Sequence, residues 1–276
     1  MKTLPQPSSA LIFLVCGALS LCGLSPVEAR TIGFFYALEA DLAAFKEGAS
    51  DTVRSISIGT TVVSEFRCGS DRVFAAKMGS GCVSTAINVQ AVLTRFPCDL
   101  VISLGPVGAL KSDLAAEQWY RVHECIPWQT GSHTNSGFQH KERSKIPLPV
   151  HDQNMELVPR GWKTLDEISV ASGEVFVASQ DFGLDLAERT GCDSVDMNLF
   201  GLLSAVEAHD IPSLHFRIVS DQADEDASGD FRKFVESYDG QGGKMVALHI
   251  QSLPPDPRSP ASYPTLRELL DSTAGD

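Results

Sequence analysis

Apolar runs alternate with amphipathic stretches through most of the chain after residue 30. Residues 31–37 and 100–104 are continuous apolar runs, which predict buried strands. Residues 83–96 carry their apolar side chains at helical spacing and follow residues 71–78, which predict another strand. Strands that alternate with helices favour a parallel sheet covered by helices on both faces.

The same patterns place the remaining elements. Further strands are predicted at residues 55–63, 65–68, 118–125, 174–179, 193–197 and 213–219, the first two as a hairpin turned at Gly59-Thr60. Further helices are predicted at residues 41–46, 184–190, 199–209, 231–253 and 266–270. The polar residues 127–165 predict a long loop or two short elements. We therefore expect one three-layer α/β domain over residues 30–253, with a central, mostly parallel mixed β-sheet flanked by helices, and a proline-rich tail over residues 254–276.

The first 29 residues have the pattern of a signal peptide. Lys2 precedes an apolar run over residues 11–24, and Val27-Glu28-Ala29 offers small residues for cleavage. The run is shorter than the roughly 20 residues that a membrane-spanning helix needs. We predict cleavage before Arg30 and a periplasmic or secreted protein, with an uncleaved anchor as the alternative.

Charge and cysteine content narrow the choice of ligand. The chain has 276 residues and a net charge of −13, which disfavours nucleic acid and anionic membranes as partners because a polyanion needs a basic surface. A small molecule remains open. Five cysteines follow the predicted signal, an odd number without metal-binding spacing, and we expect small buried side chains; the sequence would not choose a disulfide pair among them. They are Cys68, Cys82, Cys98, Cys125 and Cys192.

Polar residues follow several predicted strands, at the edge where α/β sheets bind ligands. Asp221 follows a buried strand and could act as a general acid or simply cap the next segment. Asp41 follows the first strand and could equally be a first-turn acid of a helix. Phe182 could stack on a planar ring or belong to the core. The histidines lack metal-binding spacing, and we expect neither a metal nor a cofactor.

Five motifs occur in order over about residues 31–252: IGFFYALEADL, MGSGCVSTA, DLVISLGPVGAL, SVDMNLFGLLSA and FRIVSDQAD. Together they resemble the methylthioadenosine/adenosylhomocysteine nucleosidase family of the nucleoside phosphorylase superfamily. The resemblance implies hydrolysis of the N-glycosidic bond of a purine nucleoside or a 5′-modified adenosine, and it suggests a homodimer. It leaves the 5′ substituent and the preferred base open.

The resemblance also assigns roles to individual residues. Asp221 would protonate the departing base, with Ser220 beside it, and Asp41 would orient the attacking water. The groups that would hold water or substrate are Arg217, Met197, Phe182, Asn198 and Gly105, with Met197 under the ribose and Phe182 approximately on the base.

Three positions depart from the family pattern. Asn198 lies where the family has a glutamate that grips the ribose hydroxyls, Pro106 replaces a hydroxyl residue, and Asp41 is one methylene shorter than the usual glutamate. The loop over residues 105–108 also lacks the cationic and hydroxyl side chains that phosphate needs, which favours water as the nucleophile. The alternatives are a nucleoside-binding protein on the same fold and a purine nucleoside phosphorylase.

Overall fold

The computed structural model describes residues 29–140, 146–147 and 165–253. Residues 1–28 of the predicted signal and the tail from residue 254, with its predicted helix, lie outside them. The strands are β1 (Thr31–Tyr36), β2 (Ser50–Ile58), β3 (Thr61–Cys68), β4 (Asp71–Lys77), β5 (Leu100–Ala109), β6 (Trp119–Pro127), β7 (Gly131–Thr134), β8 (Gly137–His140), β9 (Ile146–Pro147), β10 (Glu167–Ser172), β11 (Ser194–Asp196) and β12 (Ser213–Asp221). The helices are α1 (Glu39–Gly48), α2 (Cys82–Arg95), α4 (Gln180–Thr190), α5 (Leu199–Ala208), α6 (Ala227–Ser237) and α7 (Gln241–Ser252).

The large sheet has the strand order β11-β10-β6-β12-β5-β1-β4-β3-β2, with β9 beside β6. Strand β1 runs parallel to both β4 and β5, and β12 runs parallel to β5. Strands β6 and β12 pair antiparallel, as do β2 and β3. Strand β11 pairs with β10 on one side and with the end of β5 on the other, so the sheet closes on itself around the ends of β5 and β12. The predicted mixed sheet in a single α/β domain is thus confirmed.

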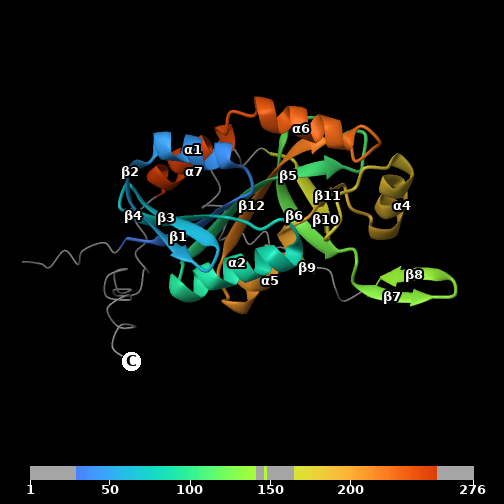
Figure 1. The fold of residues 1–276 in the computed structure, drawn as a ribbon, viewed down its shortest axis with the longest axis horizontal. Helices are drawn as coiled ribbons and strands as arrows, with labels where there is room; N and C mark the ends of the chain where they lie inside the picture. The colour runs from blue at the N-terminus through green and yellow to red at the C-terminus, as the bar shows by residue number, and fades with distance from the viewer. Residues whose placement is uncertain (1–28, 141–145, 148–164, 254–276) are drawn as a thin grey trace, which may run out of the picture.

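Helices cover both faces of the sheet, and β1 shows why. Its side chains alternate, so Phe34 packs into the core under α1 and α7, whereas Phe35 packs into the core under α2 and α5. Figure 1 shows α1, α6 and α7 along one side of the sheet and α2 and α5 along the other. The domain therefore has the expected three layers.

The predicted closing helix at residues 231–253 is wrong, because the structure has two helices there. Helix α6 ends at Ser237, and α7 begins after Gly240, whose φ of 76° is left-handed. A Cβ at Gly240 would lie 2.0 Å from the carbonyl oxygen of Ala40. Close packing of α7 against α1 therefore requires glycine, and the turn into α7 breaks the helix.

The predicted strand at residues 174–179 is also wrong. The strand of this region is β10, which ends at Ser172, and residues 173–179 form an irregular segment. Val175, Phe176 and Val177 look like a strand in sequence, but they line a cavity instead of pairing in the sheet. Consecutive apolar side chains can line a binding site as well as fill a core. The local sequence pattern does not distinguish these two environments.

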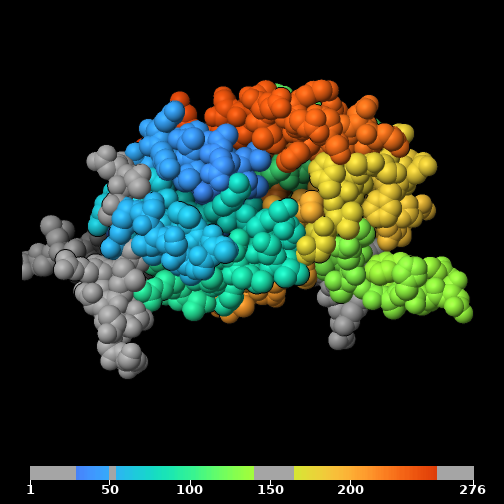
Figure 2. Space-filling model, viewed as in Figure 1, coloured from blue at the N-terminus to red at the C-terminus, as the bar shows by residue number. Residues whose placement is uncertain are grey.

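The polar stretch after β6 contains three short strands in its described part, β7, β8 and β9. Strands β7 and β8 form a hairpin that projects from the body of the domain (Figure 2). The five cysteines are buried free thiols, as expected for small core residues. None of the described helices is both long and apolar enough to cross a membrane.

Candidate active site

A cavity of about 300 Å³ lies where the ends of β1, β4, β5, β11 and β12 meet the segment after β10. Its polar lining side chains are Lys77, Ser80, Asp196, Asn198, Ser220 and Asp221. Its wall includes the apolar side chains of Leu38, Met78, Met197, Val175, Phe176, Val177 and Phe231. The cavity is thus mostly apolar with a few polar groups, which is typical of a site for a small organic ligand.

A bulge at the end of β12 brings two neighbouring side chains to the cavity. The pairing with β5 shifts between Val219 and Asp221, leaving Ser220 as the extra residue. In a regular strand, successive side chains point to opposite faces, whereas here both Ser220 and Asp221 line the cavity. Both residues are buried, with 7% and 4% of their surface exposed.

The Asp221 carboxyl is held by two donors. The Ser220 hydroxyl donates to Oδ2 over 2.8 Å, and the Ala223 amide donates to Oδ1 over 3.0 Å. Ala223 has a φ of 52°, a strained value for a residue with a Cβ. Burial raises the pKa of Asp221 and outweighs the lowering by the two hydrogen bonds. A buried carboxyl with a raised pKa at the wall of a cavity can serve as a general acid.

Gly108 leaves room for this carboxyl. A Cβ at Gly108 would lie 2.8 Å from Asp221 Oδ1 and 3.3 Å from Val195. Any larger residue would displace the acid, so glycine at this position of β5 is explained by close approach. Pro106 itself lines the cavity, whereas Gly105 lies behind it against Ala37.

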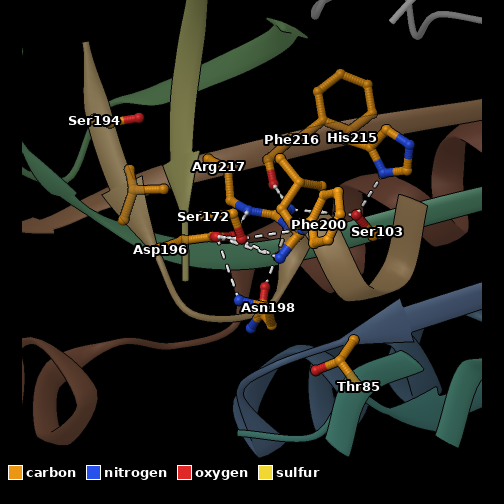
Figure 3. A network of polar contacts seen from close by, with 12 residues as sticks. Thr85, Ser103, Ser172, Ser194, Asp196, Asn198, Phe200, His215, Phe216 and Arg217 are labelled. Carbon is orange, nitrogen blue, oxygen red and sulfur yellow. Dashed lines mark hydrogen bonds and ion pairs between the residues drawn. The ribbon is translucent and has the colours of Figure 1, made fainter. Parts of the chain in front are cut away.

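Asp196 and Arg217 form a buried ion pair beside the cavity (Figure 3). Arg217 Nε lies 3.2 Å from Asp196 Oδ2, and the Arg217 side chain is fully buried. Asp196 also accepts from the Ser172 hydroxyl over 2.6 Å and from the Leu199 amide at the start of α5. Both oxygens of Asp196 are therefore engaged. Arg217, expected to help hold water, is not among the residues that line the cavity.

Arg217 instead reaches the cavity through Asn198. Its Nη2 donates to Asn198 Oδ1 over 3.4 Å, and Asn198 lines the cavity with 9% of its surface exposed. On the other side, Arg217 Nη1 donates to the Ser103 hydroxyl over 3.2 Å. The guanidinium therefore links Asn198 to polar residues deeper in the sheet.

These deeper residues form a directed chain. Ser103 Oγ lies 2.8 Å from His215 Nδ1, and His215 Nε2 lies 2.8 Å from Ser213 Oγ. Burial and the charge of Arg217 lower the pKa of His215 to about 3, so its ring is neutral. Arg217 can only donate to Ser103, so the Ser103 hydroxyl can give its own proton to Nδ1, an arrangement that places the His215 ring proton on Nε2.

The aromatic side chains that line the cavity are Phe176 and Phe231, and not the expected Phe182. Phe182 does not line it, and packs edge-to-face against Trp128 at 5.5 Å between ring centroids. Phe176 and Phe231 do line the cavity and contact each other edge-to-face at 5.8 Å. These two residues, which sequence reasoning missed, are the candidates for contact with a planar base.

Asp41 is not brought to the cavity. Its Oδ1 accepts from the Tyr238 hydroxyl over 2.6 Å and from the Gly243 amide over 3.2 Å. Gly243 lies in the first turn of α7, and its amide also bonds the Gly240 carbonyl oxygen over 2.9 Å. Asp41 thus caps α7 from α1, and burial raises its pKa to about 6. This geometry does not support the expected role in orienting water.

The glycine turn before α2 has a partner within the chain. Glu174 Oε1 accepts from the Val83 amide over 2.8 Å, so its carboxylate occupies the beginning of α2. Gly79 and Ser80 still line the cavity. The turn therefore shapes the cavity wall, while the Val83 amide in the first turn of α2 is satisfied by Glu174.

A sequence profile of the Phosphorylase superfamily matches residues 31–248, so the chain belongs to this superfamily. A similar protein is the 5′-methylthioadenosine/S-adenosylhomocysteine nucleosidase of Staphylococcus saprophyticus subsp. saprophyticus, which is 24% identical over 230 residues, covering 80% of this chain and 100% of that protein.

Solved structures show the same fold. The Neisseria meningitidis 5′-methylthioadenosine/S-adenosylhomocysteine nucleosidase, in complex with methylthio-immucillin-A, has a TM-score of 0.70 at 21% identity, covering 81% of this chain and 100% of that chain. The Helicobacter pylori futalosine hydrolase has a TM-score of 0.69 at 19% identity, covering 82% and 97%. At these identities the likeness concerns the fold.

Proposed function

We propose that this chain is an exported nucleosidase, an N-glycosidic bond hydrolase acting on a purine nucleoside or a 5′-modified adenosine. The observation that carries the proposal is Asp221, a buried carboxyl with a raised pKa that faces an apolar cavity beside Phe176. The nucleosidase activity of the similar proteins supports the same reaction.

In the proposed reaction, the Asp221 carboxyl gives its proton to the departing base. Loss of the base is the difficult step, because an unprotonated purine leaves as an anion. Phe176, Val177 and Phe231 supply an apolar wall for the planar base. The Ser220 hydroxyl then stabilises the carboxylate that remains on Asp221.

The attacking water has no dedicated carboxylate among the residues that line the cavity. Asp221 serves the base, and both oxygens of Asp196 are engaged. We infer that catalysis rests chiefly on activation of the leaving base, which makes the sugar cationic enough for water to attack. The attacking water then loses one proton, which balances the proton that Asp221 gave to the base.

Phosphate is disfavoured as the nucleophile. Lys77 is the cationic side chain among the residues that line the cavity, and its Nζ is paired with Glu39 Oε1 at 3.0 Å. Arg217 is buried against Asp196. A doubly charged phosphate would therefore find little uncompensated positive charge.

The geometry of Asp41 favours one alternative, a nucleoside-binding protein with little turnover, because the expected water-orienting group caps α7 instead. A nucleoside panel incubated with the domain, with and without phosphate, separates the readings. The nucleosidase releases base and free sugar at a rate independent of phosphate. Binding without base release supports the alternative, and sugar 1-phosphate identifies a phosphorylase.

The predicted cleavage before Arg30 fits the start of the folded domain. The backbone nitrogen of Arg30 lies 3.0 Å from Asp71 Oδ1, and its Nη2 lies 3.0 Å from Asp71 Oδ2. Cleavage would turn that nitrogen into an ammonium group facing a carboxylate, which strengthens the contact. This supports the proposal of an exported protein.

We also propose a homodimer, as the family resemblance suggests. Val83 and Ile87, one turn apart on α2, are 65% and 64% exposed. Such adjacent apolar side chains suit a protein–protein contact. Light scattering on the purified domain would give the mass directly.

A further inference from the structure

The side-chain amide of Asn198 has a defined orientation. Arg217 offers only donors, so the atom 3.4 Å from its Nη2 must be the amide oxygen. The reverse orientation would set two donors against each other. Figure 3 shows the oxygen turned toward Arg217 and the nitrogen on the opposite side.

The guanidinium itself cannot turn away. Its Nε is paired with Asp196, and its Nη1 donates to Ser103 and to the carbonyl oxygen of Phe216 over 3.0 Å. Ser103 is fixed in turn by His215. The Asn198 side-chain oxygen is therefore held as an acceptor for Arg217 and is not available to a ligand.

The Asn198 nitrogen is left for a ligand. No hydrogen bond to this nitrogen occurs within the described part of the chain, although 91% of the Asn198 surface is buried and the residue lines the cavity. With Asp221 and Ser220 committed to the base, and Lys77 paired with Glu39, Asn198 is the buried polar group available to a sugar hydroxyl.

We propose that the Asn198 side-chain nitrogen donates a hydrogen bond to a sugar hydroxyl, whose oxygen is the acceptor. A carboxylate at this point could only accept, so it would require a hydroxyl proton, whereas the Asn198 amide supplies its own proton. The site should therefore take nucleosides whose sugar carries an acceptor-only group at that position. This inference deepens the proposed function and rests on it for the placement of the sugar.

Fluorinated nucleosides test the donor directly. Fluorine is small, accepts weakly and cannot donate. The dissociation constants of adenosine and of its 2′-deoxy, 3′-deoxy, 2′-deoxy-2′-fluoro and 3′-deoxy-3′-fluoro analogues would be measured by calorimetry. At one of the two sugar positions, we expect the fluoro analogue to bind about 2–5-fold more tightly than the deoxy analogue, because it keeps a partner for the amide.

Asn198→Asp should reverse this preference. Its carboxylate keeps an oxygen for Arg217, so the fold is retained, but it sets a second acceptor against fluorine. The fluoro analogue should then bind at least about 10-fold more weakly than the deoxy analogue. Asn88→Asp, a half-buried change on α2 outside the cavity lining, is the matched control and should leave both ratios unchanged.

Two results would overturn the proposal: weaker binding of both fluoro analogues than of their deoxy counterparts in the unmodified protein, or ratios that Asn198→Asp does not change. Base release is measured separately in the same samples. Reversed ratios without base release would refute the proposed reaction while supporting the donor. Failure of all five nucleosides to bind would overturn both.

Discussion

Ser220 donates a hydrogen bond to the carboxyl of Asp221 over 2.8 Å, and one bulge in β12 brings both residues to the cavity. Burial raises the pKa of Asp221, while this hydrogen bond lowers it by favouring the charged form. Ser220 therefore adjusts the pKa of Asp221, and substitutions of the two residues can be tested separately.

Removing the acid should abolish most turnover. Asp221→Asn keeps the size of the side chain but cannot deliver a proton, so we expect kcat to fall roughly 10²–10⁴-fold. Asp226→Asn, an exposed change just before α6, is the control and should be neutral. Steady-state base release measures both, and full turnover in Asp221→Asn would refute the assignment.

Removing the serine hydroxyl should move the pH profile. Ser220→Ala takes away a donor that stabilises the carboxylate, so the pKa of Asp221 should rise further. The acid would stay protonated to higher pH, and the basic limb of kcat against pH should shift upward. A basic limb that does not move would show that Asp221 is not the titrating acid.

The aromatic residues should divide between binding and packing. Phe176→Ala removes a face of the cavity, and stacking on a base is worth about 1–3 kcal/mol, so KM should rise roughly 5–150-fold. Phe182→Ala loses contact with Trp128 and should lower the melting temperature with KM little changed. The opposite pattern would restore Phe182 as the base contact.

Asp41 should affect stability more than chemistry. Its pKa of about 6 in the folded protein exceeds the ordinary 3.8, so the folded state binds this proton more tightly. That stabilisation is present at low pH and is lost as the pH rises from about 4 to about 6. Against Asp41→Asn, the unfolding free energy of the unmodified protein should fall by about 3 kcal/mol over this range.

Denaturant titrations of the two proteins at several pH values measure this difference. The asparagine keeps an oxygen for Tyr238 and Gly243, so its kcat should stay within about threefold, an allowance equal to one weak hydrogen bond. A collapse of kcat at unchanged stability would instead return Asp41 to the catalytic role that the family resemblance implies.

Export should leave Arg30 at the amino terminus. N-terminal sequencing of protein recovered from the cell envelope or the medium should begin at Arg30 or within a residue or two. Asp71→Asn in that mature protein should lower the melting temperature, because it removes the carboxylate that faces Arg30. Recovery of an intact chain beginning at Met1 would contradict the cleavage.

Much of the fold could be predicted because strand and helix periodicity is local. The strands predicted at residues 213–219 and 193–197 are confirmed as β12 and β11, and the cavity lies at their ends. Sequence order also placed Ser220 and Asn198 on the cavity. These residues come directly after buried strands, so their position follows from the sheet.

The remaining site residues depend on contacts that the local pattern does not contain. Phe176 lies in a stretch that looks like a strand, and the family resemblance pointed to Phe182 as the base contact instead. Asp41 occupies the expected position in sequence, but its partner amide is at Gly243, 202 residues away. Only the packing of α7 decides where that carboxylate points.

The contact between α1 and α7 also bears on when the domain can fold. Asp41 on α1 can contact Gly243 on α7 only after nearly the whole domain has been synthesised. Pairings of such long sequence separation form late, since closing a long loop is entropically unfavourable. A nascent chain would therefore lack the packed pair of α1 and α7 for as long as α7 is missing. During that time the domain would stay loosely folded, and the chain could still be threaded.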